Sequence, residues 1–237
     1  MNIFTPLSHE VPWVIQAAIL SASLLLLVGI LVRRRIASEG GGLLPDEGVT
    51  IRNLMEVLIE ALANLARDRI GEDWRKYFPL IGTMFLFILV SNLLGLIPGL
   101  GSATSDINTT AGWAIISWVA YTWAGVVRHK GNYALKFMGP VLWRPRVFGR
   151  ELRVRVLAPF MIIIEVPLDL ARMMTLAIRL LANMFADHTV IGVWIMLIPI
   201  GIPAIFMGLG VVIAFLQAFI FSLLTMIYIG LALEEPH

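Results

Sequence analysis

The sequence contains no cysteine and few charged side chains, and these two shortages exclude several classes of protein. Without cysteine there is no disulfide, no thiolate nucleophile and no cysteine-ligated metal or cluster. Charged residues make up only 14% of the 237 residues, whereas soluble globular chains carry about 25%. The formal net charge of +2 is too small to indicate a nucleic-acid partner, and no basic run is interleaved with aromatic residues as in RNA-binding proteins.

The sequence also lacks the short motifs of common enzyme classes. It has no glycine-rich phosphate loop ending in Gly-Lys-Ser/Thr, no His-Glu-x-x-His zinc pair and no Gly-x-Ser-x-Gly nucleophile turn. We therefore expect no metal, no cofactor and no nucleotide hydrolysis by this chain alone. It is predicted not to be an enzyme by itself.

Apolar residues are abundant instead. They make up 59% of the chain, and the mean hydropathy is +0.86. A membrane helix needs about 20 apolar residues, so the length accommodates about five membrane helices and their connections. The composition predicts an all-α polytopic membrane protein that forms a single membrane domain over residues 1–237.

The N-terminal part is expected to contain one span and one surface helix. The apolar run of residues 13–32 is followed by three arginines, whereas a signal peptide carries its basic residues before the run. Residues 1–36 are therefore interpreted as a span with the N-terminus outside and the arginines in the cytoplasm. Residues 50–70 combine apolar residues at helical spacing with many charges. This pattern predicts an amphipathic helix on the cytoplasmic membrane surface or against another subunit.

Residues 77–128 are predicted to form a two-span hairpin with a short polar connection. Asp106 in that connection either caps the following helix or lines an aqueous entrance, and the sequence leaves both open. Residues 129–156 form the most basic loop, which indicates the cytoplasmic side.

Residues 157–237 are predicted to form a pair of long helices. In the first, no turn signal follows Pro167 until Pro199. A helix of that length measures on the order of 60 Å, about twice the hydrocarbon thickness of a membrane. It must tilt steeply, kink at Pro167 or fold as a hairpin. Because residues 172–175 contain no glycine, proline or asparagine, a hairpin is disfavoured.

Arg179 lies near the middle of this first long helix. An arginine at the centre of a membrane helix costs roughly 2.5 to more than 10 kcal/mol, and a guanidinium does not lose its proton in proteins. A permanent cation in a low-dielectric layer usually marks an ion pathway. The working hypothesis is therefore that these two helices carry an ion pathway.

Other polar residues lie on both sides of Arg179 along the helix axis. At about 100° per residue, Glu165 and Asn183 fall close to the line of Arg179. Glu165 lies about 20 Å before the arginine, and Asp187 and His188 lie about 12–14 Å beyond it. One set of polar residues leads toward the arginine and another leads away. No carboxylate of this helix lies within one turn of it.

Some of these residues also have purely structural interpretations. Arg172 with Asp169, or Arg179 with Asp187, can form charge pairs that brace neighbouring helices. The spacing of Arg172 and Asp169 favours such a pair. The eight-residue separation of Arg179 and Asp187 disfavours a pair between these two.

His188 and Gln217 have structural alternatives too. His188 can be a buried, hydrogen-bonded histidine. Gln217 lies among bulky apolar residues of the last helix, where an interhelical hydrogen bond is its simplest role. Such a bond does not exclude a place in the ion pathway.

Around these positions the sequence resembles subunit a of the F-type ATP synthase, the stator half of its proton channel. The resemblance extends from about Thr50 onward and includes the spacing of Glu165 before Arg179. The matching stretches are residues 91–98, 176–184, 216–221 and 233–235.

The resemblance implies one copy of this chain beside a ring of c subunits, each with a membrane carboxylate, together with a peripheral-stalk subunit b and the rest of the complex. Arg179 matches the family's essential arginine, which implies that it faces the ring carboxylate, favours its ionised form and blocks direct leakage between two offset half-channels. The resemblance also implies a proton pathway through Glu165, Asn183, Asp187, His188 and Gln217, to which we add Asp106 as the entrance candidate.

The chain departs from the family at three positions. Many members carry glycine where this chain has Ala182 and Asp187. Many also carry a titratable residue in the final helix where this chain has Gly210. Asp187 is our candidate for the missing carboxylate.

Two other functions are alternatives for this sequence. A self-contained secondary transporter would use Arg179 to bind an anionic substrate, but such folds usually show internal repeats and broken helices, and neither is evident here. A membrane anchor in a respiratory assembly would tolerate leucine in place of the arginine. The default coupling ion is H⁺, with Na⁺ the alternative. The expected location is a bacterial inner membrane, because the N-terminus shows no Arg- and Ser-rich transit segment, with the C-terminus cytoplasmic.

Overall fold

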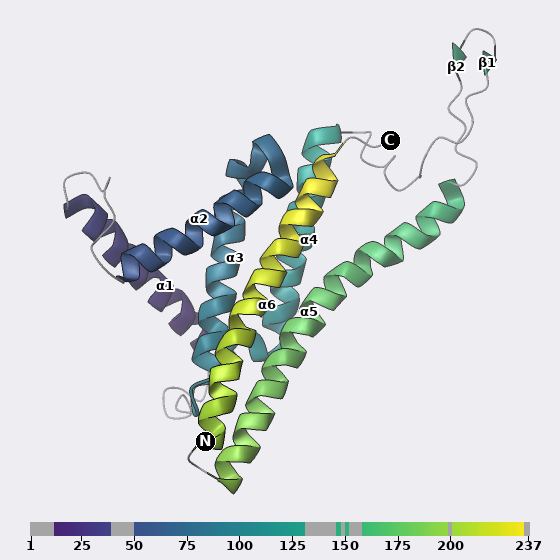
Figure 1. Ribbon diagram of the computed structural model, residues 1–237. Coiled ribbons are helices and arrows are strands. Elements are labelled where there is room, and N and C mark those ends of the chain that lie inside the picture. The colour runs from purple at the N-terminus through teal and green to yellow at the C-terminus, as the bar shows by residue number, and fades with distance from the viewer. Residues whose placement is uncertain are drawn as a thin grey trace.

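The computed structural model describes residues 12–38, 50–130, 146–147, 150–151, 158–198 and 201–234. Within these ranges the chain is mostly helical, with one antiparallel pair of two-residue strands, and its long helices are tilted against one another (Figure 1). The elements in chain order are α1 (Trp13–Ser38), α2 (Ile51–Ile70), η1 (Gly71–Asp73), α3 (Trp74–Gly95), η2 (Ala103–Ser105), α4 (Ile107–His129), β1 (Arg146–Val147), β2 (Arg150–Glu151), α5 (Ala158–Leu197) and α6 (Ile202–Leu233).

Five segments of the described chain are long and apolar enough to cross a membrane. One lies in α1, one in the α2–α3 segment, and one each in α4, α5 and α6. The chain is therefore an all-α polytopic membrane protein, as the composition predicts. The helix α1 begins with the apolar run expected from residue 13 and continues to Ser38, and α2 (51–70) lies within the predicted range 50–70.

Local side-chain chemistry explains where several helices begin and end. Thr50 caps α2, since its hydroxyl accepts a hydrogen bond from the backbone N–H of Asn53 at 3.3 Å. Asp106 caps α4 in the same way, because its Oδ1 accepts from the N–H of Asn108 at 2.7 Å. Gly71 ends α2 with φ +79°, and Gly201, with φ +93°, precedes α6; both conformations favour glycine.

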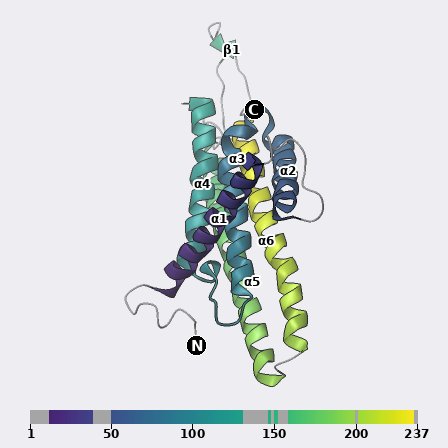
Figure 2. The same ribbon diagram turned by 90° about the vertical axis from the view of Figure 1, so that its left-hand side faces the viewer.

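The helix α5 runs unbroken for 40 residues through Pro167, so the hairpin alternative is wrong. At 1.5 Å per residue it is about 60 Å long. Its N-terminal part diverges from α4 and α6 (Figure 1). At the other end, α5 and the 32-residue α6 extend beyond the remaining helices (Figures 1 and 2). Both are longer than a perpendicular membrane crossing needs.

The core is formed where α3, α4 and α6 pack together, with one face of α5 against them. It is mostly apolar, but it also contains hydroxyls that bond to each other between helices. Ser117 of α4 and Thr225 of α6 are fully buried, with their oxygens 2.9 Å apart. The largest buried apolar side chains are Ile81, Met84, Phe85, Ile88, Leu180, Phe221, Met226 and Ile229.

The amphipathic helix α2 packs against α3 and α6 of its own chain. Its contact with α6 is very close at Gly230, where a Cβ atom would overlap the backbone carbonyl of Arg69. Near its start, the buried Arg52 donates from Nε to Glu56 Oε1 at 2.9 Å. Leu54 remains 53% exposed, so part of the apolar face of α2 is free for lipid or another subunit.

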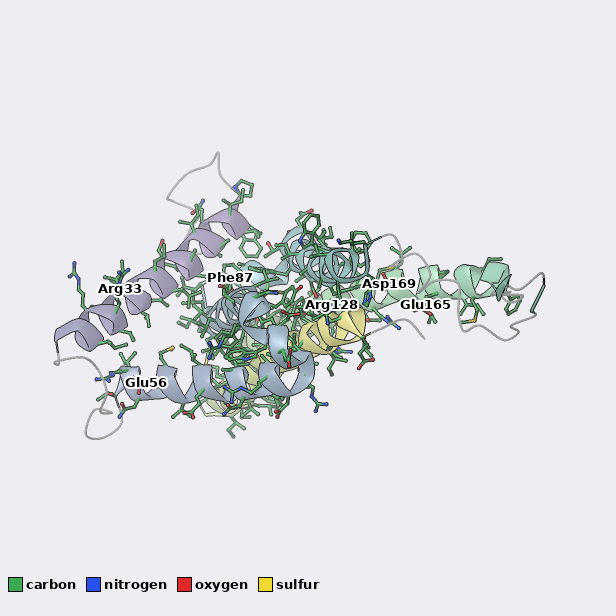
Figure 3. The ribbon with its side chains drawn as sticks, turned by 90° about the horizontal axis from the view of Figure 1, so that it is seen from above. Arg33, Glu56, Phe87, Arg128, Glu165 and Asp169 are labelled. Atoms are coloured by element: carbon green, nitrogen blue, oxygen red, sulfur yellow. The ribbon has the colours of Figure 1, made fainter. Side chains whose placement is uncertain are left out.

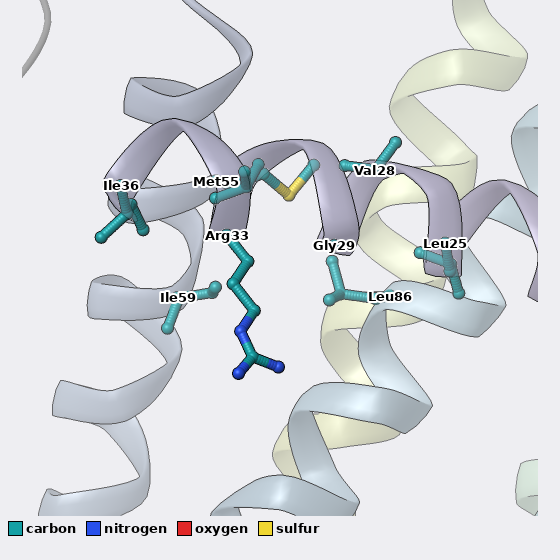
Figure 4. Close-up of a pocket in the computed structure, with 9 residues that line it drawn as sticks. Leu25, Val28, Gly29, Arg33, Ile36, Met55, Ile59 and Leu86 are labelled. Atoms are coloured by element: carbon teal, nitrogen blue, oxygen red, sulfur yellow. The ribbon is translucent and has the colours of Figure 1, made fainter. Parts of the chain in front are cut away.

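Apolar cavities flank the core in the described part of the chain, and two of them are well defined. One, of about 270 Å³, lies between α1, α2 and α3, and the guanidinium of Arg33 reaches into it from α1 between Ile59 and Leu86 (Figure 4). The other, of about 240 Å³, lies between α4 and α5. Neither of these two cavities includes the predicted pathway residues among its lining.

The basic segments of the described chain gather at one end of the molecule. The C-terminal ends of α1, α4 and α6 lie toward this end, and the β1–β2 hairpin lies beyond them (Figure 1). Arg33 and Arg34 are near the end of α1, Arg128 is near the end of α4, and the hairpin contributes Arg146 and Arg150. Membrane proteins typically carry an excess of lysine and arginine in their cytoplasmic loops.

Candidate functional site

Arg179 lies at the edge between the packed and the exposed faces of α5. The neighbours on the packed side, Leu176 and Leu180, are 2% and 0% exposed, whereas Arg179 itself is half-buried. On the other side, exposed and small side chains follow the helix at Thr175, Ala182 and Ala186. Small residues let another helix approach closely, so the arginine borders a strip suited to a partner helix.

No carboxylate of the described residues lies within 4 Å of Arg179, so the alternative of an Arg179–Asp187 charge pair is not found there. The nearby apolar side chains Ile178 and Phe185 are 55% and 70% exposed. The arginine therefore sits beside an apolar surface without a charged partner from the described part of its own chain.

One turn beyond the arginine, Asn183 bonds to Gln217 of α6. Asn183 Nδ2 donates to Gln217 Oε1 at 2.7 Å, and Gln217 is only 3% exposed. This confirms the interhelical hydrogen bond predicted for Gln217. The bond fixes the position of α6 relative to α5 close to Arg179.

We expect this bond to contribute measurably to stability. A double-mutant cycle of Asn183→Ala and Gln217→Ala, followed by thermal unfolding of the purified complex, should give a coupling free energy of about 0.6–1.7 kcal/mol. Thr189→Ala is the control, because among the described residues the Thr189 hydroxyl bonds within α5, to the carbonyl of Phe185 at 2.7 Å. The coupling free energy between Thr189→Ala and Gln217→Ala should be near zero. Equal coupling free energies in the two cycles would contradict the prediction.

Beyond Asn183, the side chains of Asp187 and His188 are half-buried. The Nε2 atom of His188 is buried and has no hydrogen-bond partner within the described ranges. The alternative of a hydrogen-bonded buried histidine is therefore not found at this nitrogen. A buried polar atom without a partner is costly, and in native structures such an atom usually bonds to an ordered water or ion or belongs to a functional site.

Gly210 has a steric explanation in this chain. It is buried in α6, and a Cβ atom there would overlap the side chain of Leu96. A titratable side chain at position 210 therefore requires Leu96 to move. Asp187 as the compensating carboxylate stays a prediction.

Asp106 acts as the helix cap already described, and its role at an entrance stays a prediction. Beside it lies a buried network of hydroxyls that the sequence did not reveal. Thr104 Oγ1 donates to Asn92 Oδ1 at 2.6 Å, and Ser91 Oγ donates to Ser21 Oγ at 3.0 Å. Ser102, which contacts both Thr104 and the Ser91 carbonyl, joins these pairs. The only sequence signal was polar Ser91 and Asn92 inside an apolar span.

Glu165 belongs to a charged cluster in the N-terminal half of α5. The predicted Arg172–Asp169 pair is confirmed at 3.6 Å, and Arg172 also lies 3.9 Å from Glu165. Sequence reasoning missed the aromatic residues around this cluster, which come from α4 and α6: Trp118, Tyr121 and Tyr228. Within the described ranges, no three His, Asp or Glu side chains converge to hold a metal ion.

Comparisons with known proteins agree on one family. The family model described as ATP synthase A chain matches residues 15–230. The chain is 40% identical over 215 residues to ATP synthase subunit a 3 of Pelobacter propionicus, covering 91% of this chain and 85% of the relative. It is 38% identical over 213 residues to ATP synthase subunit a of Geobacter sulfurreducens, covering 90% and 86%. It is 36% identical over 211 residues to the same subunit of Bdellovibrio bacteriovorus, covering 89% and 86%.

Proposed function

The chain belongs to the ATP synthase subunit a family, and we propose that it provides two offset half-channels that lead protons to and from the membrane carboxylate of a rotating c-subunit ring. In this proposal Arg179 is the electrostatic gate between the half-channels. The chain conducts ions for the complex and is not catalytic by itself.

The observation that carries the proposal is the position of Arg179. It has no carboxylate partner in the described part of its chain, and it borders a strip of small, exposed side chains on α5. A ring helix that approaches this strip brings its carboxylate within reach of the guanidinium. The cation then attracts the ionised carboxylate and repels a proton that would pass directly from one half-channel to the other.

The polar residues on the two sides of Arg179 supply the two half-channels. Glu165 lies toward the end of the molecule that carries the basic segments, which we assign to the cytoplasm under the positive-inside rule. Asp187, His188 and the Asn183–Gln217 pair lie on the other side, which we assign to the periplasmic half-channel with Asp106 at its entrance.

The partners in this proposal are the c-ring at the exposed face of α5, a peripheral-stalk subunit b, the rest of the ATP synthase and the surrounding lipid. The coupling ion is H⁺. The chain lies in a bacterial inner membrane with its N-terminus periplasmic and its C-terminus cytoplasmic.

Reconstitution separates this function from that of a secondary transporter. We expect the purified chain alone in liposomes to give no proton or anion flux above protein-free liposomes, because the carboxylate that links the two half-channels is on the ring. The same chain within the membrane sector that contains the c-ring should conduct protons when a potential is applied. Anion flux through the chain alone would favour the transporter.

A further inference from the structure

The guanidinium of Arg172 lies between two carboxylates of its own helix. Its Nη1 atom is 3.6 Å from Asp169 Oδ1, and its Nη2 atom is 3.9 Å from Glu165 Oε1. Its Cζ atom is 5.6 Å from the ring centroid of Tyr228 in α6. Charge-assisted hydrogen bonds are typically about 2.7–2.9 Å long, so the cation forms a close pair with neither carboxylate and is shared by both.

The two carboxylates differ in how they are held. Asp169 is anchored by α4, since Trp118 Nε1 donates to its Oδ2 at 2.9 Å and Tyr121 Oη donates to its Oδ1 at 3.1 Å. For Glu165, the charge contact to Arg172 is the one polar contact among the described residues. The Asp169 side chain is 13% exposed and the Glu165 side chain is 23% exposed. Both lie in the N-terminal half of α5, where Figure 3 labels them.

We propose that Asp169 is a positioning residue of the proton pathway, which holds Arg172 back from Glu165 so that the Glu165 carboxylate stays free to exchange protons. The inference rests on the proposed function, because it takes Glu165 to be part of the pathway. Asp169 itself does not carry the proton, since both of its oxygens are engaged by side chains of α4.

The physical reason is competition between two anions for one cation. While Asp169 is ionised and fixed, its attraction offsets that of Glu165, and Arg172 stays between them. Without the charge at Asp169, Glu165 is the remaining anion of the cluster. Arg172 then moves into a close, bidentate pair with Glu165. That pair stabilises the ionised carboxylate and occupies its oxygens, so protonation of Glu165 becomes rarer.

Asp169→Asn tests this with little change in shape, because the amide keeps an oxygen that can accept from Trp118 or Tyr121. In membrane vesicles that contain the assembled ATP synthase, passive proton conduction through the membrane sector should fall about tenfold. Trp118→Phe, which removes one of the two donors that anchor Asp169, should give a smaller decrease of about threefold. Assembly is checked by co-purification of the partner subunits.

The second substitution Arg172→Gln distinguishes positioning from a merely structural role. In the Asp169→Asn background it removes the cation that blocks Glu165, so conduction should recover at least several-fold above the single variant. Added to Trp118→Phe, the same substitution should likewise raise proton conduction above that of the single variant. If Asp169 only braced the helices, each double variant would conduct protons no better than the single variant from which it was made. Unchanged conduction in both single variants, or no recovery in either double variant, overturns the inference.

Glu165→Gln separates failure of this inference from failure of the proposed function. If conduction is insensitive to Glu165→Gln and to Arg179→Ala, the proposed pathway is wrong and the inference falls with it. If Glu165→Gln lowers conduction while Asp169→Asn leaves it unchanged, the pathway stands and only the role of Asp169 is wrong.

Discussion

Arg179→Ala is expected to abolish coupled ATP synthesis while the complex still assembles. The arginine is half-buried and has no charged partner in the described part of its chain, so its removal breaks no ion pair there. The fixed charge that separates the two half-channels is lost, however, and protons can then leak past the ring carboxylate. ATP synthesis driven by a proton gradient should fall by at least about a hundredfold, as after loss of one preorganised charge or donor at a site of charge transfer.

Arg179→Lys is the sharper variant, because it keeps a positive charge. Lysine can lose its proton in a low-dielectric site and lacks the planar fork of arginine, so most of the coupling should be lost here too. Arg34→Ala, which removes an exposed arginine near the end of α1, should leave ATP synthesis near the wild-type rate. Full coupling by Arg179→Ala in an assembled complex would refute the gate, and full coupling by Arg179→Leu would favour the membrane anchor.

The helices could be predicted from the sequence because their causes are local. Apolar runs of sufficient length define the spans, and the Thr50 cap and Gly71 define the ends of α2. The unbroken course of α5 follows from the lack of a turn signal between Pro167 and Pro199. The Asp106 cap also depends only on its neighbours in the chain.

The contacts of the site could be predicted only in part, because they depend on how distant segments are aligned. The polarity of Gln217 indicated an interhelical bond, but its partner Asn183, 34 residues earlier, follows from the register of α5 against α6. Trp118 and Asp169 are 51 residues apart, and no periodicity in either helix indicates that they meet. The occupation of the space at Gly210 by Leu96 is likewise a property of packing.

Gly230→Ala is expected to have the largest effect on stability. A Cβ atom at this position overlaps the backbone carbonyl of Arg69, and a backbone atom cannot rotate away as a side chain does. The helix α2 must shift from α6, which loosens the packing of Leu62 and Ala66, 4% and 0% exposed. Overpacking of this kind costs about 1–3 kcal/mol, so the thermal midpoint of the purified complex should fall by roughly 2–12 °C.

Gly208→Ala is the matched control, because Gly208 lies in the same helix and a Cβ atom there meets no atom within 4 Å. Alanine favours a helix over glycine by up to about 1 kcal/mol, so this variant should melt at the wild-type temperature or slightly above it. Helix propensity alone would raise the thermal midpoint of both variants. A lower midpoint for Gly230→Ala together with an unchanged or higher one for Gly208→Ala therefore identifies the close contact as the cause. If Gly230→Ala melts as Gly208→Ala does, then α2 does not pack against α6 at this glycine, and the amphipathic helix is held by the membrane surface or by another subunit instead.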